Sequence, residues 1–141
     1  MRDMAAEEIR TFLQAGTRTG KAALVRKDGR PHVTPIWFVL DGEDVVFNTW
    51  HESVKGNCLQ RDPRLSLCVD EEAPPYAFVM VEGVVDISRD PDQLYEFARR
   101  IAARYMGPDR AEEYGRRNSV EGELLVRLMP EKIVAKMDVA G

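Results

Sequence analysis

Hydrophobic and polar residues alternate along most of this chain in short runs, and Asp-Gly, Asp-Pro and Pro-Pro pairs separate the runs. Residues 21–26 and 31–40 are extended runs on either side of Asp28-Gly29, a pair typical of a tight hairpin turn. Asp41-Gly42 repeats that signal, so the first half predicts a meander of three strands. Further strands are predicted at 65–69, at 76–87 with a bend at Gly83, at 123–128 and at 132–137.

Helical spacing of apolar residues occurs in a few separate places. It predicts helices over 5–15, 52–61, 91–106 and 111–117. The clearest of them is 91–106, where Asp90 can cap the first turn and Gly107 can end the last. Together these predicted elements indicate a mainly β protein with six or seven strands and a few helices. Such strands usually close into a barrel or a sandwich, because open sheet edges invite unwanted pairing.

The predicted strand 31–40 carries large apolar side chains on both faces. Val33, Trp37 and Val39 fall on one face, and Ile36, Phe38 and Leu40 fall on the other. One face can belong to the barrel core, and the other then requires a partner subunit or a flat ligand. The alternative is an ordinary edge strand, because Pro35 has no N–H to donate to a neighbouring strand.

Polar residues gather where the next strand ends. Asn48 and Thr49 close that strand, a helix begins near Ser53, and Lys55 lies in its first turn. The N-terminus of a helix offers free N–H groups and positive potential, both of which favour a phosphate. The alternative is simple capping by Ser53 beside a solvent-exposed lysine.

Composition narrows the class of protein. The chain has 141 residues, of which 44% are hydrophobic and 31% are charged, as expected for one globular domain over 1–141. We expect a helix within 1–15 and a barrel over 16–137. The net charge of −4 gives no indication of nucleic-acid binding. Arginines are nonetheless frequent over 99–117, which is typical of a solvated helix surface or, alternatively, of a rim that attracts an anion.

The sequence offers little for membrane insertion, metal binding or catalytic side chains. No run approaches the ~20 apolar residues of a membrane span, and the N-terminus has no apolar signal stretch, which favours a cytoplasmic protein. Cys58 and Cys68 form no CxxC pair, so no metal site is expected. Nucleotide-binding glycine motifs and nucleophile motifs are absent. His32 and His51 have no recognisable partner, so no catalytic residue is assigned.

Four runs taken in order resemble a known family: 27–38, 53–57, 61–64 and 76–83. They are similar to the split barrels of the pyridoxamine 5′-phosphate oxidase-like family, and within it to the deazaflavin-dependent branch that uses coenzyme F420. The similarity extends from about residue 16 to residue 137. It implies an FMN-binding type of split β-barrel, assembled as a homodimer with two cofactor sites at the interface.

The resemblance also implies an activity, namely F420-dependent transfer of a hydride to an unsaturated or conjugated small molecule. In such enzymes the cofactor supplies the redox chemistry and the protein supplies position and electrostatics. Two alternatives remain open. One is an FMN-binding oxidoreductase of the pyridoxamine-phosphate-oxidase type, and the other is a non-enzymatic protein that binds a flavin, a haem or another tetrapyrrole.

The implied cofactor-binding residues fall into three groups. Residues along the ring are His32, Thr34, Pro35, Ile36 and Trp37; those near the phosphate are Thr49, Ser53, Lys55, Gly56, Asn57 and Arg61; and Tyr76 reaches the ring from the second subunit. The chain departs from its relatives in two places. Asn57-Cys58 stands where they often carry Arg-Asn, and Gln60-Arg61 stands where they often carry Arg-Arg.

Overall fold

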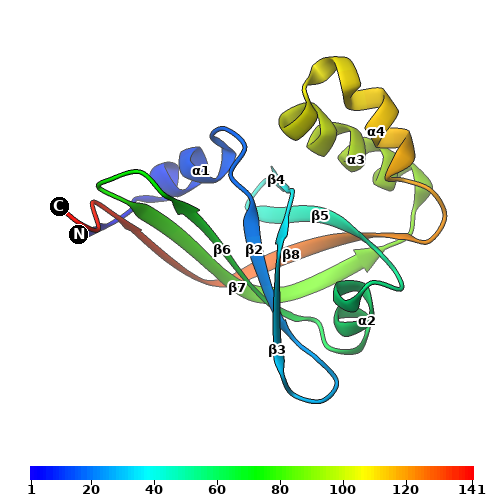
Figure 1. The fold of residues 1–141 in the computed structure, drawn as a ribbon, viewed down its shortest axis with the longest axis horizontal. Helices are drawn as coiled ribbons and strands as arrows, with labels where there is room; N and C mark the ends of the chain where they lie inside the picture. Colours follow the sequence, from blue (N-terminus) through cyan, green and yellow to red (C-terminus); the bar gives the residue numbers. More distant parts are fainter.

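A computed structural model describes residues 1–141 and shows one antiparallel sheet of eight strands with four α-helices (Figure 1). The strands are β1 (Arg2–Asp3), β2 (Gly20–Val25), β3 (Pro31–Ile36), β4 (Val39–Asp41), β5 (Asp44–Trp50), β6 (Arg64–Glu71), β7 (Ala77–Ser88) and β8 (Glu123–Met137). The helices are α1 (Ala6–Gln14), α2 (Val54–Arg61), α3 (Pro91–Met106) and α4 (Ala111–Arg117). The mainly β fold predicted from the sequence is confirmed.

The strands pair in the order β3-β2-β6-β7-β8-β5-β4, and β1 adds to β8 beside the C-terminus. The sheet curls so that the chain joins its two edges directly, through Trp37 and Phe38 between β3 and β4. The prediction of one strand over 31–40 and of a three-strand meander is therefore wrong. Pro35 donates no N–H, and the Phe38 N–H is bonded to the hydroxyl of Tyr105, so the strand pairing breaks here.

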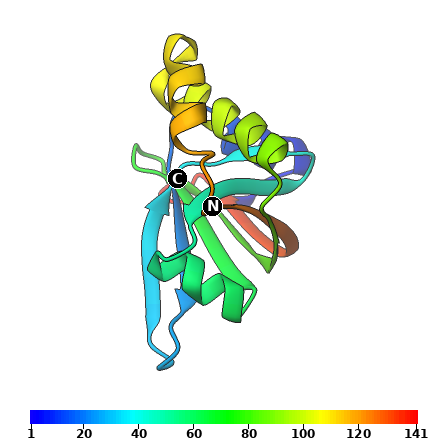
Figure 2. The same ribbon diagram turned by 90° about the vertical axis from the view of Figure 1, so that its right-hand side faces the viewer.

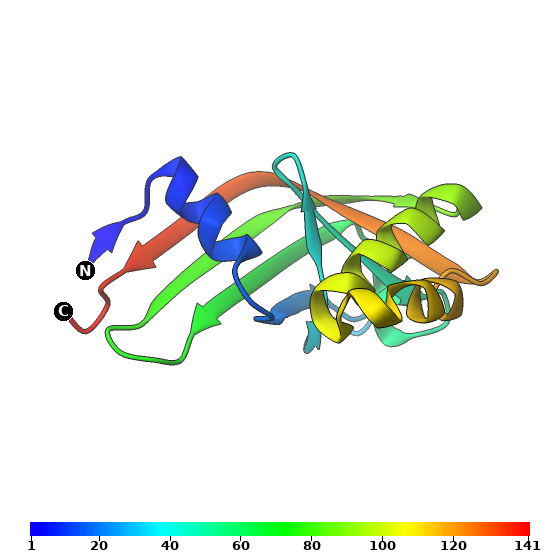
Figure 3. The same ribbon diagram turned by 90° about the horizontal axis from the view of Figure 1, so that it is seen from above.

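The core lies inside the curled sheet and follows the two-residue period of the strands. Ile36, Phe38 and Leu40 are buried, whereas Val33 is 62% exposed and Trp37 38% exposed. The two-faced pattern of 31–40 thus places one face in the core and leaves much of the other uncovered. Figure 3 shows α1 and the pair α3–α4 above different parts of the sheet. Leu13 of α1 packs into the main core, while α3 covers the outer face of β5 and β8.

The two predicted C-terminal strands are one long strand, β8, with a bulge. β7 pairs with β8 along its length, and the register shifts between Glu82 and Gly83, where Glu131 is the extra residue. A side chain on Gly83 would collide with the Met129 carbonyl oxygen, so glycine is required at this close approach. The predicted bend at Gly83 is confirmed, and Pro130 is tolerated because it lies at the irregularity.

The four predicted helices are present in the structure. Arginines within 99–117, for which the sequence left two interpretations open, have specific partners, as α3 shows. α3 begins after the Asp90 cap, which accepts from the Gln93 N–H, and ends at Gly107. The Arg104 guanidinium donates to the carbonyl oxygens of Leu13 and Phe38, each at 2.8 Å. It therefore caps the C-terminus of α1 and holds the β3–β4 crossover. This arginine stabilises the fold, as opposed to forming a free cationic rim.

Candidate functional site

A cavity of about 330 Å³ opens where β3 and β5 approach each other without pairing. Figure 2 shows the elements that frame it, with α2 and the pair α3–α4 on opposite sides of β5. Its walls come from the end of β3, the end of β5, the first turn of α2, the middle of α3 and the segment after α4. The lining residues are Pro35, Ile36, Trp37, Asn48, Thr49, Trp50, Lys55, Ile101, Asn118 and Glu123.

Lys55 provides the positive end of this cavity. Its Nζ donates to Thr34 Oγ1 at 3.0 Å, which links α2 to β3 across the gap in the sheet. Burial lowers the pKa of Lys55, and the lysine has no carboxylate partner in the structure. An anion placed here would replace the lost hydration and favour the charged form of the amine. Thr34 accepts from Lys55, so its own hydroxyl proton remains available to the same anion.

A hydroxyl network fixes the turn before α2. Ser53 Oγ donates to the Trp50 carbonyl oxygen at 2.7 Å and accepts from the Gly56 N–H at 2.9 Å. Thr49 Oγ1 lies 2.9 Å from Ser53 Oγ and therefore donates to it, because the serine proton is already used. Ser53 is thus the N-cap of α2, and the network fixes the first turn of the helix, from which Lys55 lines the cavity.

Glu123 and Asn48 form the other polar end. Asn48 Nδ2 donates to the Asn118 carbonyl oxygen at 3.1 Å and to Glu123 Oε2 at 3.3 Å. Burial raises the pKa of Glu123, while the Asn48 hydrogen bond and the charge of His51 act in the opposite direction with smaller effect. The cavity consequently has a cation at one end and a half-buried carboxylate at the other.

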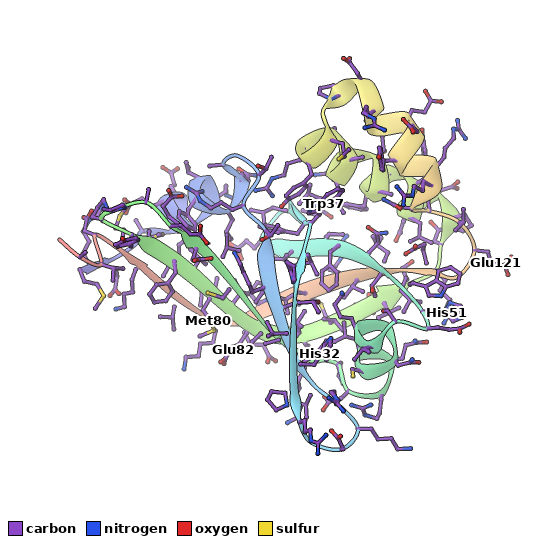
Figure 4. All side chains as sticks on the ribbon, in the orientation of Figure 1. His32, Trp37, His51, Met80, Glu82 and Glu121 are labelled. Atoms are coloured by element: carbon purple, nitrogen blue, oxygen red, sulfur yellow. The ribbon has the colours of Figure 1, made fainter.

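Two tryptophans form the aromatic part of the wall. Trp37 stacks on Tyr105 with ring centroids 5.2 Å apart and an interplanar angle of 3°. The Tyr105 hydroxyl donates to the Arg18 carbonyl oxygen, and burial raises the pKa of this tyrosine. Trp50 meets His51 edge-on at 4.7 Å. Figure 4 shows Trp37 on the crossover near α3, and His51 at the turn that follows β5.

The structure brings seven of the twelve predicted cofactor residues together. Those that line the cavity or bond to its lining residues are Thr34, Pro35, Ile36, Trp37, Thr49, Ser53 and Lys55. Gly56 lies just behind them, because a side chain there would collide with the backbone oxygens of Trp50 and His51. Its role in this chain is close packing of α2 against the end of β5.

The other four predicted residues lie outside this cavity. His32 of β3 lies opposite Leu24 of β2 and does not line the cavity. The side chain of Asn57 donates to the Glu52 carbonyl oxygen, and that of Arg61 donates to the Val25 carbonyl oxygen at 2.6 Å. Tyr76 lies in the loop between β6 and β7, where its carbonyl oxygen accepts from the Val139 N–H near the C-terminus. Figure 1 shows this loop at the end of the sheet opposite α2.

Sequence reasoning missed three lining residues that come from distant segments: Ile101, Asn118 and Glu123. Only the pairing of Glu123 with Trp50 across β5 and β8 brings this carboxylate to the cavity. The available signal was a charged residue that directly precedes the apolar run Leu124-Leu125-Val126, with Gly122 before it. A side chain on Gly122 would collide with the Trp50 ring, so the loop can approach β5 only through a glycine.

No set of three metal-binding side chains gathers anywhere in the structure, and none of its helices has the length and apolarity needed to cross a bilayer.

The sequence profile of the pyridoxamine 5′-phosphate oxidase family matches residues 5–135, so the chain belongs to this family. Among solved structures, a conserved hypothetical protein from Mycobacterium tuberculosis aligns with a TM-score of 0.84 and 27% identity, over 94% of this chain and 84% of its own. An F420 reductase aligns with a TM-score of 0.69 and 26% identity, over 87% and 94%. A haem storage protein from Vibrio cholerae shares the fold, with a TM-score of 0.75, 22% identity and full coverage of both chains. No curated protein matches the chain significantly.

Proposed function

We propose that this protein is an F420-dependent oxidoreductase that binds the deazaflavin in the gap between β3 and β5 and reduces a conjugated small molecule. The observation that carries the proposal is the unpaired ammonium of Lys55, held at 3.0 Å from Thr34 Oγ1 beside the start of α2. Similarity to an F420 reductase at 26% identity supports the choice of deazaflavin. Bound in this gap, the deazaflavin would supply the hydride chemistry.

The residues at the Lys55 end fit a phosphate. A lysine ammonium, the free hydroxyl proton of Thr34 and the first N–H groups of α2 are donors of the kind that bind phosphate oxygens. Asn57 and Arg61, which the family resemblance also assigned to the phosphate, are held by backbone carbonyls in this chain. Lys55 therefore carries most of the electrostatic attraction.

The rest of the cavity suits a flat ring. Its volume of about 330 Å³ lies at the lower end of ligand-binding pockets, and its sides are Ile36, Trp37 and Ile101. We place the ring along the end of β3, where Pro35 leaves the edge without an N–H donor. Trp37 is held by its stack on Tyr105, so this wall is already in position before a ligand arrives.

We further propose that the protein works as a homodimer. Val33 of β3 is 62% exposed, and Ala23 of β2 lies directly opposite it. Met80 of β7 belongs to the same face of the sheet, two residues further along the strands. Figure 4 shows Met80 and Glu82 on the side of β7 away from α1, α3 and α4. A second copy covering this face would bury the apolar side chains and bring its own residues, among them Tyr76, towards the cavity. Sedimentation equilibrium at micromolar concentration should show a dimer, and a well-folded monomer would contradict this assembly.

The side chains that a single copy of the chain contributes to this cavity disfavour haem. Haem iron is normally held by a histidine, cysteine, methionine or tyrosine, and none of the ten lining residues is of these types. His51 follows the lining residue Trp50, but its Nδ1 lies 2.9 Å from the Gly122 carbonyl oxygen and its Nε2 lies 3.2 Å from Glu52 Oε1. FMN has the same phosphate and ring arrangement as the deazaflavin, and it remains the second candidate.

Titration of the purified protein with F420, FMN and haem, followed by tryptophan fluorescence, tests the proposal. Trp37 and Trp50 are the two tryptophans of the chain and both line the cavity, so a ring bound there should quench their emission. We expect the strongest quenching with F420. Tight binding of FMN without a response to F420 would transfer the assignment to FMN. Quenching by neither flavin would overturn the proposed site.

A further inference from the structure

Glu123 is the carboxylate that lines the cavity, and cofactor binding as proposed above makes no use of it. It begins β8 directly opposite Trp50 of β5. Its Oε2 accepts the hydrogen bond from Asn48, whereas its Oε1 accepts none from the protein. One oxygen of a half-buried carboxyl is therefore free to face whatever occupies the cavity.

The contacts of Asn48 determine how this carboxyl is held. The same amide nitrogen donates to the Asn118 carbonyl oxygen, so it is tied to the segment after α4 as well as to β8. The amide consequently presents its N–H groups, and not its oxygen, to Glu123. The carboxyl is fixed in place by a neutral donor, which orients it without the strong stabilisation of charge that an arginine or lysine partner would provide.

Few charged groups face Glu123 from the surrounding elements. His51 contributes from the turn after β5, and its Nδ1 carries a proton because the Gly122 carbonyl oxygen can only accept. Lys55 of α2 lines the same cavity but is bonded to Thr34. α3 contributes the apolar Ile101.

The arginines at the end of α4 are engaged elsewhere. Arg116 pairs with Glu112, and Arg117 lies over the ring of Tyr114. Burial is thus the dominant influence on Glu123, and it raises the pKa of the carboxyl above its ordinary value. A flat ligand that displaces water from the cavity would favour the protonated form further.

We propose that Glu123 delivers the proton that accompanies hydride transfer in this site, an inference that rests on the proposed function. A conjugated carbonyl acceptor gains a C–H bond by taking a hydride from the reduced deazaflavin or flavin, and its π electrons move to the oxygen. That oxygen then takes the proton as the O–H bond of the Glu123 carboxyl breaks. The carboxylate left behind regains a proton from water at the open mouth of the cavity, so the acceptor has gained one hydride and one proton.

The matched pair Glu123→Gln and Glu121→Gln tests this assignment. Gln has the size of Glu and can keep a contact with Asn48, and Glu121 is an exposed carboxylate two residues away that Figure 4 shows pointing away from the body of the protein. With reduced F420 as donor and 2-cyclohexen-1-one, a simple conjugated carbonyl, as acceptor, single-turnover reduction should slow by about a hundredfold or more in Glu123→Gln. The affinity for oxidised F420 should stay within about twofold, and Glu121→Gln should behave as the wild type.

A second readout needs no turnover. The side-chain carboxyl of Glu123, followed by ¹³C NMR and assigned with the Gln variant, should show a pKa above the ordinary value of a glutamate. Saturation with oxidised F420 should raise its pKa further. Equal reduction rates in Glu123→Gln and wild type, or a Glu123 pKa that does not rise on saturation, would overturn the proton role while leaving cofactor binding intact. Failure of the wild type to bind F420 or FMN at all would instead overturn the proposed function.

Discussion

The two sides of this barrel are built in opposite ways. Along β6, β7 and β8 the strands are paired over most of their length, and the side chains that face inward, such as Leu67, Val79 and Val81, are completely buried. Between β3 and β5 the strands do not pair, and the gap is lined by polar groups such as Lys55 and Glu123 together with aromatic rings.

This difference indicates that the paired side stabilises the fold and that the unpaired side binds the ligand. The paired side buries apolar area and satisfies its backbone hydrogen bonds within the sheet, which stabilises the fold. The unpaired side keeps half-buried charges whose pKa values burial shifts towards the neutral form, a cost that a bound ligand of suitable charge can offset. Substitutions on the paired side should therefore change the free energy of unfolding, and substitutions in the gap should change affinity.

The largest effect is expected for Leu67→Ala on the paired side. Leu67 is 1% exposed in β6, and truncation leaves a cavity that should lower the free energy of unfolding by about 2–5 kcal/mol. Urea denaturation measures this change. Val120→Ala, at a residue that is 51% exposed, is the matched control and should stay within about 0.5 kcal/mol of wild type. Equal losses in the two variants would contradict the account of the core.

Gly83→Ala should also destabilise the paired side, by roughly 2–3 kcal/mol, because the new methyl group meets the Met129 carbonyl oxygen at the bulge. Gly29→Ala is the comparison, since Gly29 has a positive φ of 87° but open space around it. Its cost should be about 1–2 kcal/mol. Thermal unfolding of both variants decides the order, and a smaller loss at Gly83 than at Gly29 would mean that the bulge tolerates a side chain.

In the gap, Lys55→Ala should weaken cofactor binding by about ten- to a hundredfold, equivalent to ~1.5–3 kcal/mol, because a charge-assisted contact to phosphate is lost. Its stability should change little, since the substitution also removes a partly desolvated charge. Fluorescence titration at low salt gives the affinity. Lys27→Ala, in the exposed turn between β2 and β3, should bind as wild type does. Unchanged affinity in Lys55→Ala would remove this lysine from the site.

The smallest effect is expected for Tyr76→Ala, which tests whether a partner subunit completes the gap. An aromatic contact with the ring is worth ~0.5–1.5 kcal/mol beyond its buried area, so affinity should fall severalfold while the dimer persists. Titration and sedimentation on the same variant separate the two roles of this tyrosine. Loss of cofactor that tracks dissociation of the dimer would make Tyr76 an interface residue only, and normal binding by an intact dimer would remove it from the site.

Local sequence signals were sufficient for most of the elements. The Asp90 cap, Pro91 and Gly107 predicted α3 at its observed bounds, and the turn at Asp28-Gly29 placed the β2–β3 hairpin. These features depend on residues a few positions apart, where capping and turn chemistry act. The Lys55 end of the gap was predictable for the same reason, because Thr49, Ser53 and Lys55 belong to one strand–turn–helix segment.

What the sequence did not reveal depends on non-local pairing. The break at Trp37 and Phe38 is fixed by Arg104 and Tyr105, whose positions follow from the packing of α3 and not from the strand itself. Glu123 reaches the cavity only because β8 pairs with β5, some seventy residues earlier in the chain. Hydrophobic periodicity reports which side of a strand is buried but not which strand lies beside it.

The most direct test of the central claim is a crystal structure of the protein with F420 bound. The account predicts the phosphate within hydrogen-bonding distance of Lys55 Nζ, at the start of α2, and the ring in the gap between β3 and β5 beside Trp37. A phosphate held away from Lys55, or a ring bound outside this gap, would contradict the account.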